Sequence, residues 1–185
     1  ILFVGRIQPL KAPDVLIGAV AELVRDRPRR RERLRLIIIG SPSGPDRDWA
    51  DTLPDLAESL GIADVVEFRP HSERLELYRW YCASDLVAVP SHNESFGLVA
   101  LEAQACTRPV VAADVGGLRH AVVDGRTGLL VSGHEPSDWA KALGTVLDDH
   151  DLATRLGRAG IEHARGFSWD RSAEAILTAC RNALR

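Results

Sequence analysis

Short apolar runs alternate with longer amphipathic stretches along most of the chain. The apolar runs are rich in valine, isoleucine and leucine and lie at residues 1–4, 34–39, 65–68, 85–90, 109–113 and 128–131. Runs of this length, without polar alternation, are typical of strands buried on both faces of a parallel sheet. Helical periodicity predicts helices near 14–26, 48–60, 73–82, 96–106, 117–122, 136–148, 150–164 and 169–184.

Alternating strands and helices predict an α/β fold with a Rossmann-like, doubly wound parallel sheet of about six strands and helices on both faces. Residues 136–185 contain only helical patterns and form an expected helical tail. Ligands of such sheets bind outside the carboxyl ends of the strands. We therefore expect a site in the loops after Val4, Ile39, Phe68, Pro90 and Ala113.

Composition narrows the class of protein. A length of 185 residues suits one domain, and a net charge of −3 gives no electrostatic reason to expect a nucleic-acid partner. No apolar run is long enough to span a bilayer. Cys82, Cys106 and Cys180 lack metal-ligand spacing and suggest a reduced, cytoplasmic setting. Because an apolar run begins at Ile1 and the sequence contains no Met, we expect a piece of a longer protein.

Basic residues gather in two places. The run Arg29–Arg33 is short, and we interpret it as a solvated loop in preference to a docking patch for anions. The loop after the first strand, GRIQPLKAP, is neither a dinucleotide fingerprint nor a Walker A loop. It places Arg6 and Lys11 just beyond the strand, where a planar guanidinium and a point charge could neutralise a diphosphate. The alternative is two solvated charges.

The stretch SHNESFGLVALE combines a loop with the start of an apolar helix. We expect Ser95 to cap a helix that begins at Phe96, and Gly97 to let a ligand approach the free N–H groups of the first turn. Glu102 should lean back toward the helix start as a buried acid, where it could accept hydrogen bonds from two ribose hydroxyls. Glu94 would face another part of the ligand. The alternative makes Glu102 an exposed helix residue and Glu94 a loop charge.

Two further motifs are weak. The turn Asp114-Val115-Gly116-Gly117 contains paired glycines that permit close approach of a backbone. Arg69-Pro70-His71 follows the third apolar run and could contact a flat base or form only a turn.

Taken together, these segments resemble the C-terminal, donor-binding half of retaining GT-B glycosyltransferases of the family 4 type. That family includes bacterial mannosyl- and N-acetylglucosaminyltransferases and sucrose-phosphate synthases. The resemblance rests on GRIQPLK, on PSHNESFGLVALEA with its two glutamates, and on PVVAADVGG followed by DGRTGLLV. Three longer segments are most similar in sequence to the branch of this family that acts in actinobacterial mycothiol synthesis. They are FVGRIQPLKAPDVLI, SDLVAVPSHNESFGLVALEAQAC and VGGLRHAV.

The resemblance implies a role for each matching residue. Arg6 and Lys11 would bind the donor diphosphate and stabilise it as it leaves. Glu94 would contact hydroxyls of the donor sugar, Glu102 would hold the ribose, and Arg69 would lie beside uracil. The expected donor-binding set is Arg6, Lys11, Arg69, Glu94, Ser95, Phe96, Gly97, Leu98, Val99 and Glu102, with Arg6, Lys11 and Glu94 acting in catalysis.

The resemblance also implies ligands and partners. The donor would be a UDP-sugar, with UDP-N-acetylglucosamine favoured, and no metal or other cofactor would be needed for the chemistry. A small-molecule hydroxyl acceptor, an inositol phosphate in this branch, would bind mainly to an N-terminal domain outside residues 1–185. The last helix would cross to that domain, and the full-length enzyme could be a homodimer. Two alternatives stay open: a transferase with another donor and acceptor, such as a phospholipid mannosyltransferase, and a non-catalytic module that binds nucleotide sugars.

Two departures from the family pattern stand out. Thr107 occupies a position where the family has glycine, and a β-branched residue in the left-handed region would cost about 1 kcal/mol or more. Residues 78–83 make the helix longer than is usual in the family. We expect neither departure to touch the donor-binding residues directly.

Overall fold

The computed structural model describes residues 1–43 and 47–183. Within them, six strands form one parallel sheet in the order β3-β2-β1-β4-β5-β6. This arrangement confirms the predicted fold class. The strands are β1 (Leu2–Val4), β2 (Leu36–Ile39), β3 (Val66–Arg69), β4 (Val87–Val89), β5 (Val110–Ala113) and β6 (Gly128–Val131).

The helices occur in the predicted order, with differences at their ends. The expected helix 48–60 is two helices, the expected helix 96–106 begins later, and residue 184 of the expected last helix lies outside the described residues. The helices are α1 (Pro13–Asp26), α2 (Arg47–Ala50), α3 (Thr52–Ser59), α4 (Arg74–Ala83), α5 (Leu98–Ala105), α6 (Leu118–Ala121), α7 (Pro136–Asp148), α8 (His150–Ala164) and α9 (Trp169–Ala183), with 3₁₀ turns η1 (Pro9–Lys11) and η2 (Pro28–Glu32).

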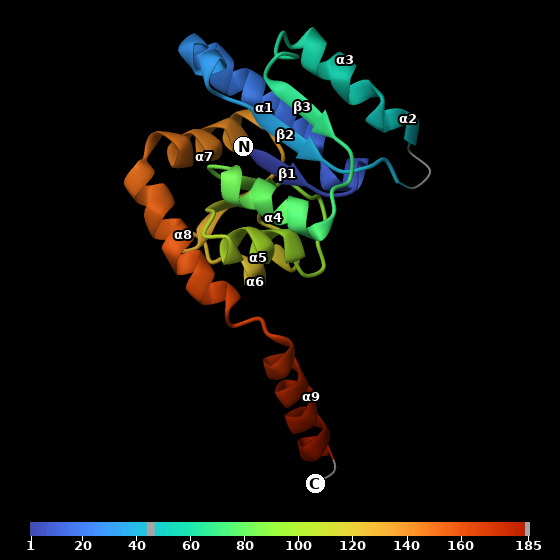
Figure 1. Cartoon of the computed structure of the whole chain (residues 1–185), viewed down its shortest axis with the longest axis vertical. Coiled ribbons are helices and arrows are strands. Elements are labelled where there is room, and N and C mark those ends of the chain that lie inside the picture. The colour runs from blue at the N-terminus through green and yellow to red at the C-terminus, as the bar shows by residue number, and fades with distance from the viewer. Residues whose placement is uncertain (44–46, 184–185) are drawn as a thin grey trace.

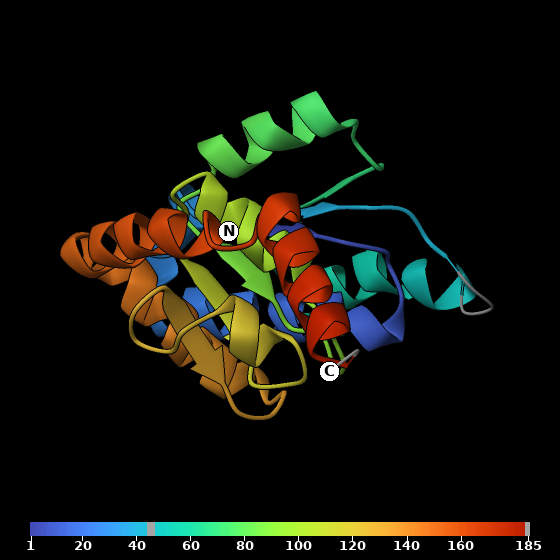
Figure 2. The same cartoon turned by 90° about the horizontal axis from the view of Figure 1, so that it is seen from below.

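The apolar runs form the centre of the core. All residues of β4 and β5 are buried, as a strand covered on both faces requires. Helix α1 packs against α3 and α7, whereas α5 packs against α6 and α8. Figure 2 shows α4 on the opposite side of the sheet from α1, standing clear of the body.

Helix α9 departs from this compact arrangement. It extends away from the sheet (Figure 1), and the side chain of Trp169 at its start is 91% exposed. Ile176 and Leu177 on the same helix are also exposed. Within the described ranges, no helix combines the length and the apolarity that a membrane crossing needs.

The strand order reverses between β1 and β4. From β1 the chain proceeds to β2 and β3 on one side, and from β4 to β5 and β6 on the other. The chain therefore leaves these two neighbouring strands in opposite directions, and open α/β sheets bind ligands at such points. This topological switch point is where the fold places a ligand.

Candidate functional site

The loops after β1 and β4 meet at the switch point. The backbone N–H of His92 donates to the carbonyl of Leu10 at 2.9 Å. Beside this contact, Lys11 Nζ donates to Glu94 Oε2 at 2.6 Å, with side chains that are 17% and 21% exposed. The fold thus brings together two predicted site residues that are far apart in the sequence.

Glu94 is held in its ionised form. Burial is the largest single influence and would raise its pKa, but the hydrogen bond and charge of Lys11 and the N–H groups of Phe96 and Gly97 outweigh it. The net effect lowers the pKa of Glu94 below its ordinary value. The switch point therefore presents a fixed anion, a fixed cation and backbone N–H donors within one small region.

The double-glycine turn after β5 supports the Glu94 loop. Gly117 donates its N–H to the carbonyl of Glu94 at 2.7 Å. A side chain at Gly117 would place its Cβ 2.2 Å from the carbonyl oxygen of Ser95, and Gly116 has φ +44°. The backbone that comes close to these glycines is therefore that of the Glu94 loop of this chain.

Helix α5 begins two residues later than expected. Its first residue is Leu98 and its N-cap is Gly97, at φ +89°, without a side-chain cap. The prediction that Ser95 caps a helix starting at Phe96 is wrong, because the left-handed conformation at Gly97 ends the loop. A Cβ at Gly97 would meet Ala121 at 2.9 Å, so glycine is required there for packing against α6.

Arg6 lies in a separate part of the carboxyl edge. It is exposed and lines a cavity of about 350 Å³. The other polar residues lining that cavity come from the loops after β2 and β3 and are Ser41, Ser43, His71 and Ser72. Arg6 makes no hydrogen bond or ion pair with residues 1–43 or 47–183, so its guanidinium is available to a ligand of this edge.

Glu102 is exposed, which corrects the expectation of a buried acid. Its Oε2 accepts a hydrogen bond of 2.8 Å from the hydroxyl of Tyr81 in α4, a side chain that is only 3% exposed. The residue faces solvent because neighbouring Leu101 and Ala103 take the buried side of α5. Burial, and after it the charge of Glu102, raises the pKa of Tyr81. Tyr81 thus stays a donor to this carboxylate.

Arg69 lies at the end of β3 and is exposed. It forms an ion pair with Glu67, and its guanidinium carbon lies 5.5 Å from the ring centre of Trp80. The longer segment 78–83 therefore contacts Arg69 through Trp80 and Glu102 through Tyr81. The expectation that this departure does not touch the proposed donor-binding residues is wrong.

The other departure, Thr107, has the backbone conformation that the sequence predicted. Thr107 has φ +62°, in the left-handed region. Gly157 of α8 packs closely against the carbonyl oxygen of Thr107, because a Cβ on that glycine would lie only 2.3 Å from this oxygen. The strain is therefore located where α5 passes into β5 and meets α8.

Sequence reasoning missed a histidine pair beside the Glu94 loop. The rings of His92 and His134 lie 3.9 Å apart, and His134 Nε2 is 3.4 Å from the carbonyl of Ser91. Burial, then the neighbouring His134, lowers the pKa of His92, whereas Asp14 opposes the shift. The rule that selected the other loops could have found His134, because it follows β6 at the same edge of the sheet.

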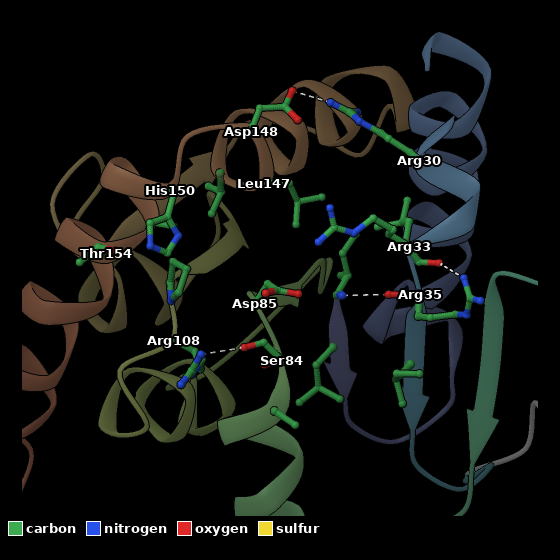
Figure 3. A pocket seen from close by; sticks show the side chains of 18 of the residues that line it. Arg30, Arg33, Arg35, Ser84, Asp85, Arg108, Leu147, Asp148, His150 and Thr154 are labelled. Carbon is green, nitrogen blue, oxygen red and sulfur yellow. Dashed lines mark hydrogen bonds and ion pairs between the residues drawn. The ribbon is translucent and has the colours of Figure 1, made fainter. Parts of the chain in front are cut away.

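A larger cavity, of about 820 Å³, lies at the amino ends of the strands. Figure 3 shows Arg30, Arg33 and Arg35 along one side of it and Arg108 across from them. Arg30 is only 15% exposed and lies 2.5 Å from Asp148, so the interpretation of the basic run as a solvated loop is wrong in this part. None of the residues expected to bind the donor lines this cavity.

Five of the predicted residues thus fall into three groups. Lys11 and Glu94 pair at the switch point, Arg6 lines the smaller cavity, and Arg69 and Glu102 each contact α4. Across the described part of the chain, no three His, Cys, Asp or Glu side chains are placed to hold a metal ion. The carboxyl edge therefore offers cations, hydrogen-bond donors and carboxylates suited to a phosphorylated ligand with hydroxyl groups.

Comparison with known proteins agrees with this chemistry. The chain is 54% identical to the D-inositol 3-phosphate glycosyltransferase of Kineococcus radiotolerans and 58% identical to that of Actinosynnema mirum. These matches cover 100% and 96% of this chain but only 44% and 42% of those relatives. The chain therefore spans less than half the length of the curated relatives it matches.

Solved structures show the same fold. Anabaena Alr3699/HepE in complex with UDP superposes with a TM-score of 0.86 at 26% identity, over 98% of this chain and 48% of that one. Sucrose-phosphate synthase from Thermosynechococcus elongatus gives a TM-score of 0.82 at 30% identity, over 99% of this chain and 45% of that one. A family described as glycosyl transferases group 1 matches residues 1–163. With that match covering most of its length, the chain belongs to the group 1 glycosyl transferases.

Proposed function

We propose that residues 1–185, with the helical tail 136–185, form the donor-binding half of a retaining GT-B glycosyltransferase. The donor is UDP-N-acetylglucosamine and the acceptor is a hydroxyl of 1D-myo-inositol 3-phosphate, in mycothiol biosynthesis. The names of relatives such as those of Kineococcus and Actinosynnema support the substrates. The observation that carries the site is the Lys11–Glu94 pair at the switch point, flanked by the N–H groups of Phe96 and Gly97.

The cations serve the departing diphosphate. Negative charge builds on its oxygens as the bond from the anomeric carbon breaks. Lys11 supplies a point charge and Arg6 a planar fork for those oxygens. Both come from the loop after β1, where Arg6 is exposed and Lys11 is paired with Glu94. Positive charge beside these oxygens stabilises the negative charge that develops on them, so these two residues promote departure of UDP.

Glu94 serves the sugar. Its lowered pKa keeps it ionised, so it can only accept hydrogen bonds, and sugar hydroxyls are donors. Lys11 neutralises Glu94 in the unliganded site and shifts toward the diphosphate when the donor binds. The acceptor oxygen then bonds to the anomeric carbon on the face that UDP leaves, and its proton passes to an oxygen of the departing phosphate. Retention follows without a nucleophilic side chain.

Calorimetry with three ligands tests the donor assignment. We expect UDP-N-acetylglucosamine to bind more tightly than GDP-mannose, with UDP alone in between. Glu94→Ala should lower the affinity for UDP-N-acetylglucosamine by roughly tenfold or more, which is the effect of losing one hydrogen bond to a charged group. The affinity for UDP should change little. Glu94→Gln, which keeps the shape but loses the charge, is the matched control for packing.

Two outcomes would contradict the proposal. An equal loss of UDP affinity in Glu94→Ala would remove Glu94 from the sugar, and preference for GDP-mannose would make the donor wrong. We also propose that the chain alone binds donor without turnover, because the acceptor site belongs to the other half. Repeated turnover by residues 1–185 with an acceptor would contradict that part.

A further inference from the structure

Helix α4 is anchored by few side chains. Of its residues only Tyr81 is buried, and the helix stands clear of the body in Figure 2. The neighbouring residues Trp80 and Tyr81 each make a contact outside the helix, to Arg69 on β3 and to Glu102 on α5. One turn of α4 therefore links two residues that the proposed site needs from different elements.

The Tyr81 contact orients Glu102. The phenol is 3% exposed and donates to Oε2 at 2.8 Å, whereas Glu102 itself is exposed and would otherwise rotate freely in water. A carboxylate has about four acceptor positions. Tyr81 occupies one of them, which leaves the second oxygen free for a ligand. The hydroxyl therefore restricts the carboxylate without saturating it.

The Trp80 contact orients Arg69 in a similar way. The guanidinium carbon lies 5.5 Å from the indole ring centre, within the range of a cation–π interaction. Glu67 pairs with the same guanidinium. Arg69 is thus held from two sides at the carboxyl end of β3, with the remainder of its plane open to solvent.

We propose that the Trp80-Tyr81 turn is a positioning element for the nucleoside half of the donor, in which Tyr81 holds Glu102 toward the ribose hydroxyls and Trp80 holds Arg69 beside the base. This inference rests on the proposed function. The Lys11–Glu94 pair has its partners in the loops after β1 and β4. The turn should therefore affect recognition of the nucleoside and leave recognition of the diphosphate unchanged.

Tyr81→Phe removes only the hydroxyl and leaves the buried ring in place. Calorimetry with UDP and with 2′,3′-dideoxyuridine diphosphate separates the ribose hydroxyls from the rest of the ligand. We expect the wild-type chain to prefer UDP, and Tyr81→Phe to lose roughly fivefold of that preference, the scale of a weakened hydrogen bond to a charged group. Tyr78→Phe is the matched control, since Tyr78 is on the same helix but is 56% exposed.

Trp80→Leu provides a second variant that does not depend on Tyr81. We expect it to weaken binding of UDP several-fold and to leave binding of inorganic pyrophosphate unchanged. A Tyr81→Phe chain with the wild-type preference for UDP, or a Trp80→Leu chain that binds pyrophosphate and UDP equally poorly, would overturn this inference alone. A wild-type chain that does not bind UDP would overturn the proposed function as well.

Discussion

The ionisation of Glu94 depends on Lys11, its partner at 2.6 Å. Without that cation, burial would act against only the N–H groups of Phe96 and Gly97. We therefore expect Lys11→Met to raise the pKa of Glu94, as measured by NMR titration of its carboxyl carbon. An unchanged pKa would show that Lys11 does not hold this carboxylate.

The same pair should make stability depend on pH. Because folding lowers the pKa of Glu94, its contribution to the free energy of unfolding is present above the ordinary value of 4.5 and is lost as pH falls through the lower folded value. Lys11→Met should thus destabilise the chain more near pH 7 than near pH 3, measured by urea denaturation. Lys141→Met is the control, since Lys141 pairs with Asp138 on an exposed helix face.

Thr107 offers a test of backbone strain. Its left-handed φ of +62° costs about 1–2 kcal/mol for a residue with a Cβ. Glycine avoids this strain but lowers stability by about 0.5–1 kcal/mol, because it makes the unfolded chain more flexible. Thr107→Gly should therefore raise the free energy of unfolding by roughly 0.5–1 kcal/mol in urea denaturation. Thr107→Ala keeps a Cβ in the same conformation and should gain nothing. Equal effects of the two substitutions would contradict this explanation.

At the level of elements, the start of α5 depends on Gly97. An added Cβ would be strained by φ +89° and would meet Ala121 at 2.9 Å. We expect Gly97→Ala to cost about 2–3 kcal/mol of stability and to displace the N–H groups of Phe96 and Gly97 from Glu94. Gly125→Ala has a similar φ of +68° with no atom within 4 Å, and should cost only about 1 kcal/mol. Similar losses would mean that packing on α6 is not what requires glycine.

The elements that the sequence predicts best are those whose signal is local. Buried strands read as continuous apolar runs, so each strand of the described sheet lies within its predicted range or ends one residue beyond it, at Arg69. Helix ends are set by turn geometry instead. The start at Leu98 follows from the left-handed conformation of Gly97, which an apolar pattern does not encode. The break before Thr52 has no such cause, because Asp51 has helical backbone angles.

The candidate site also combines features that the sequence predicts with features that depend on tertiary structure. The carboxyl-edge rule found Lys11 and Glu94 because strand order alone brings their loops together. The favoured expectation of a buried Glu102 was wrong and the alternative of an exposed helix residue was right in this respect, since apolar neighbours surround Glu102 in sequence whichever way it points. Its contact with Tyr81 depends on how α4 crosses α5, which only the tertiary structure gives.

At the scale of the whole molecule, α9 exposes an apolar face that includes Ile176 and Leu177. We propose that this face packs against the N-terminal half in a longer protein of the relatives' length. Amide hydrogens of α9 should then exchange quickly in residues 1–185 and become protected in the longer protein, whereas those of α7, which packs against α1, should not change. Equally fast exchange in both would contradict this packing.

We propose that the carboxyl edge of the sheet binds the donor diphosphate at the switch point. The most direct test is NMR chemical-shift mapping of the backbone amides of this chain with UDP-N-acetylglucosamine. We predict saturable shifts at Arg6, at Lys11 and in the first turn of α5, and none at Arg30, Arg33 and Arg108 in the cavity at the opposite edge. Shifts confined to Arg30, Arg33 and Arg108, or no saturable shifts at all, would contradict the account.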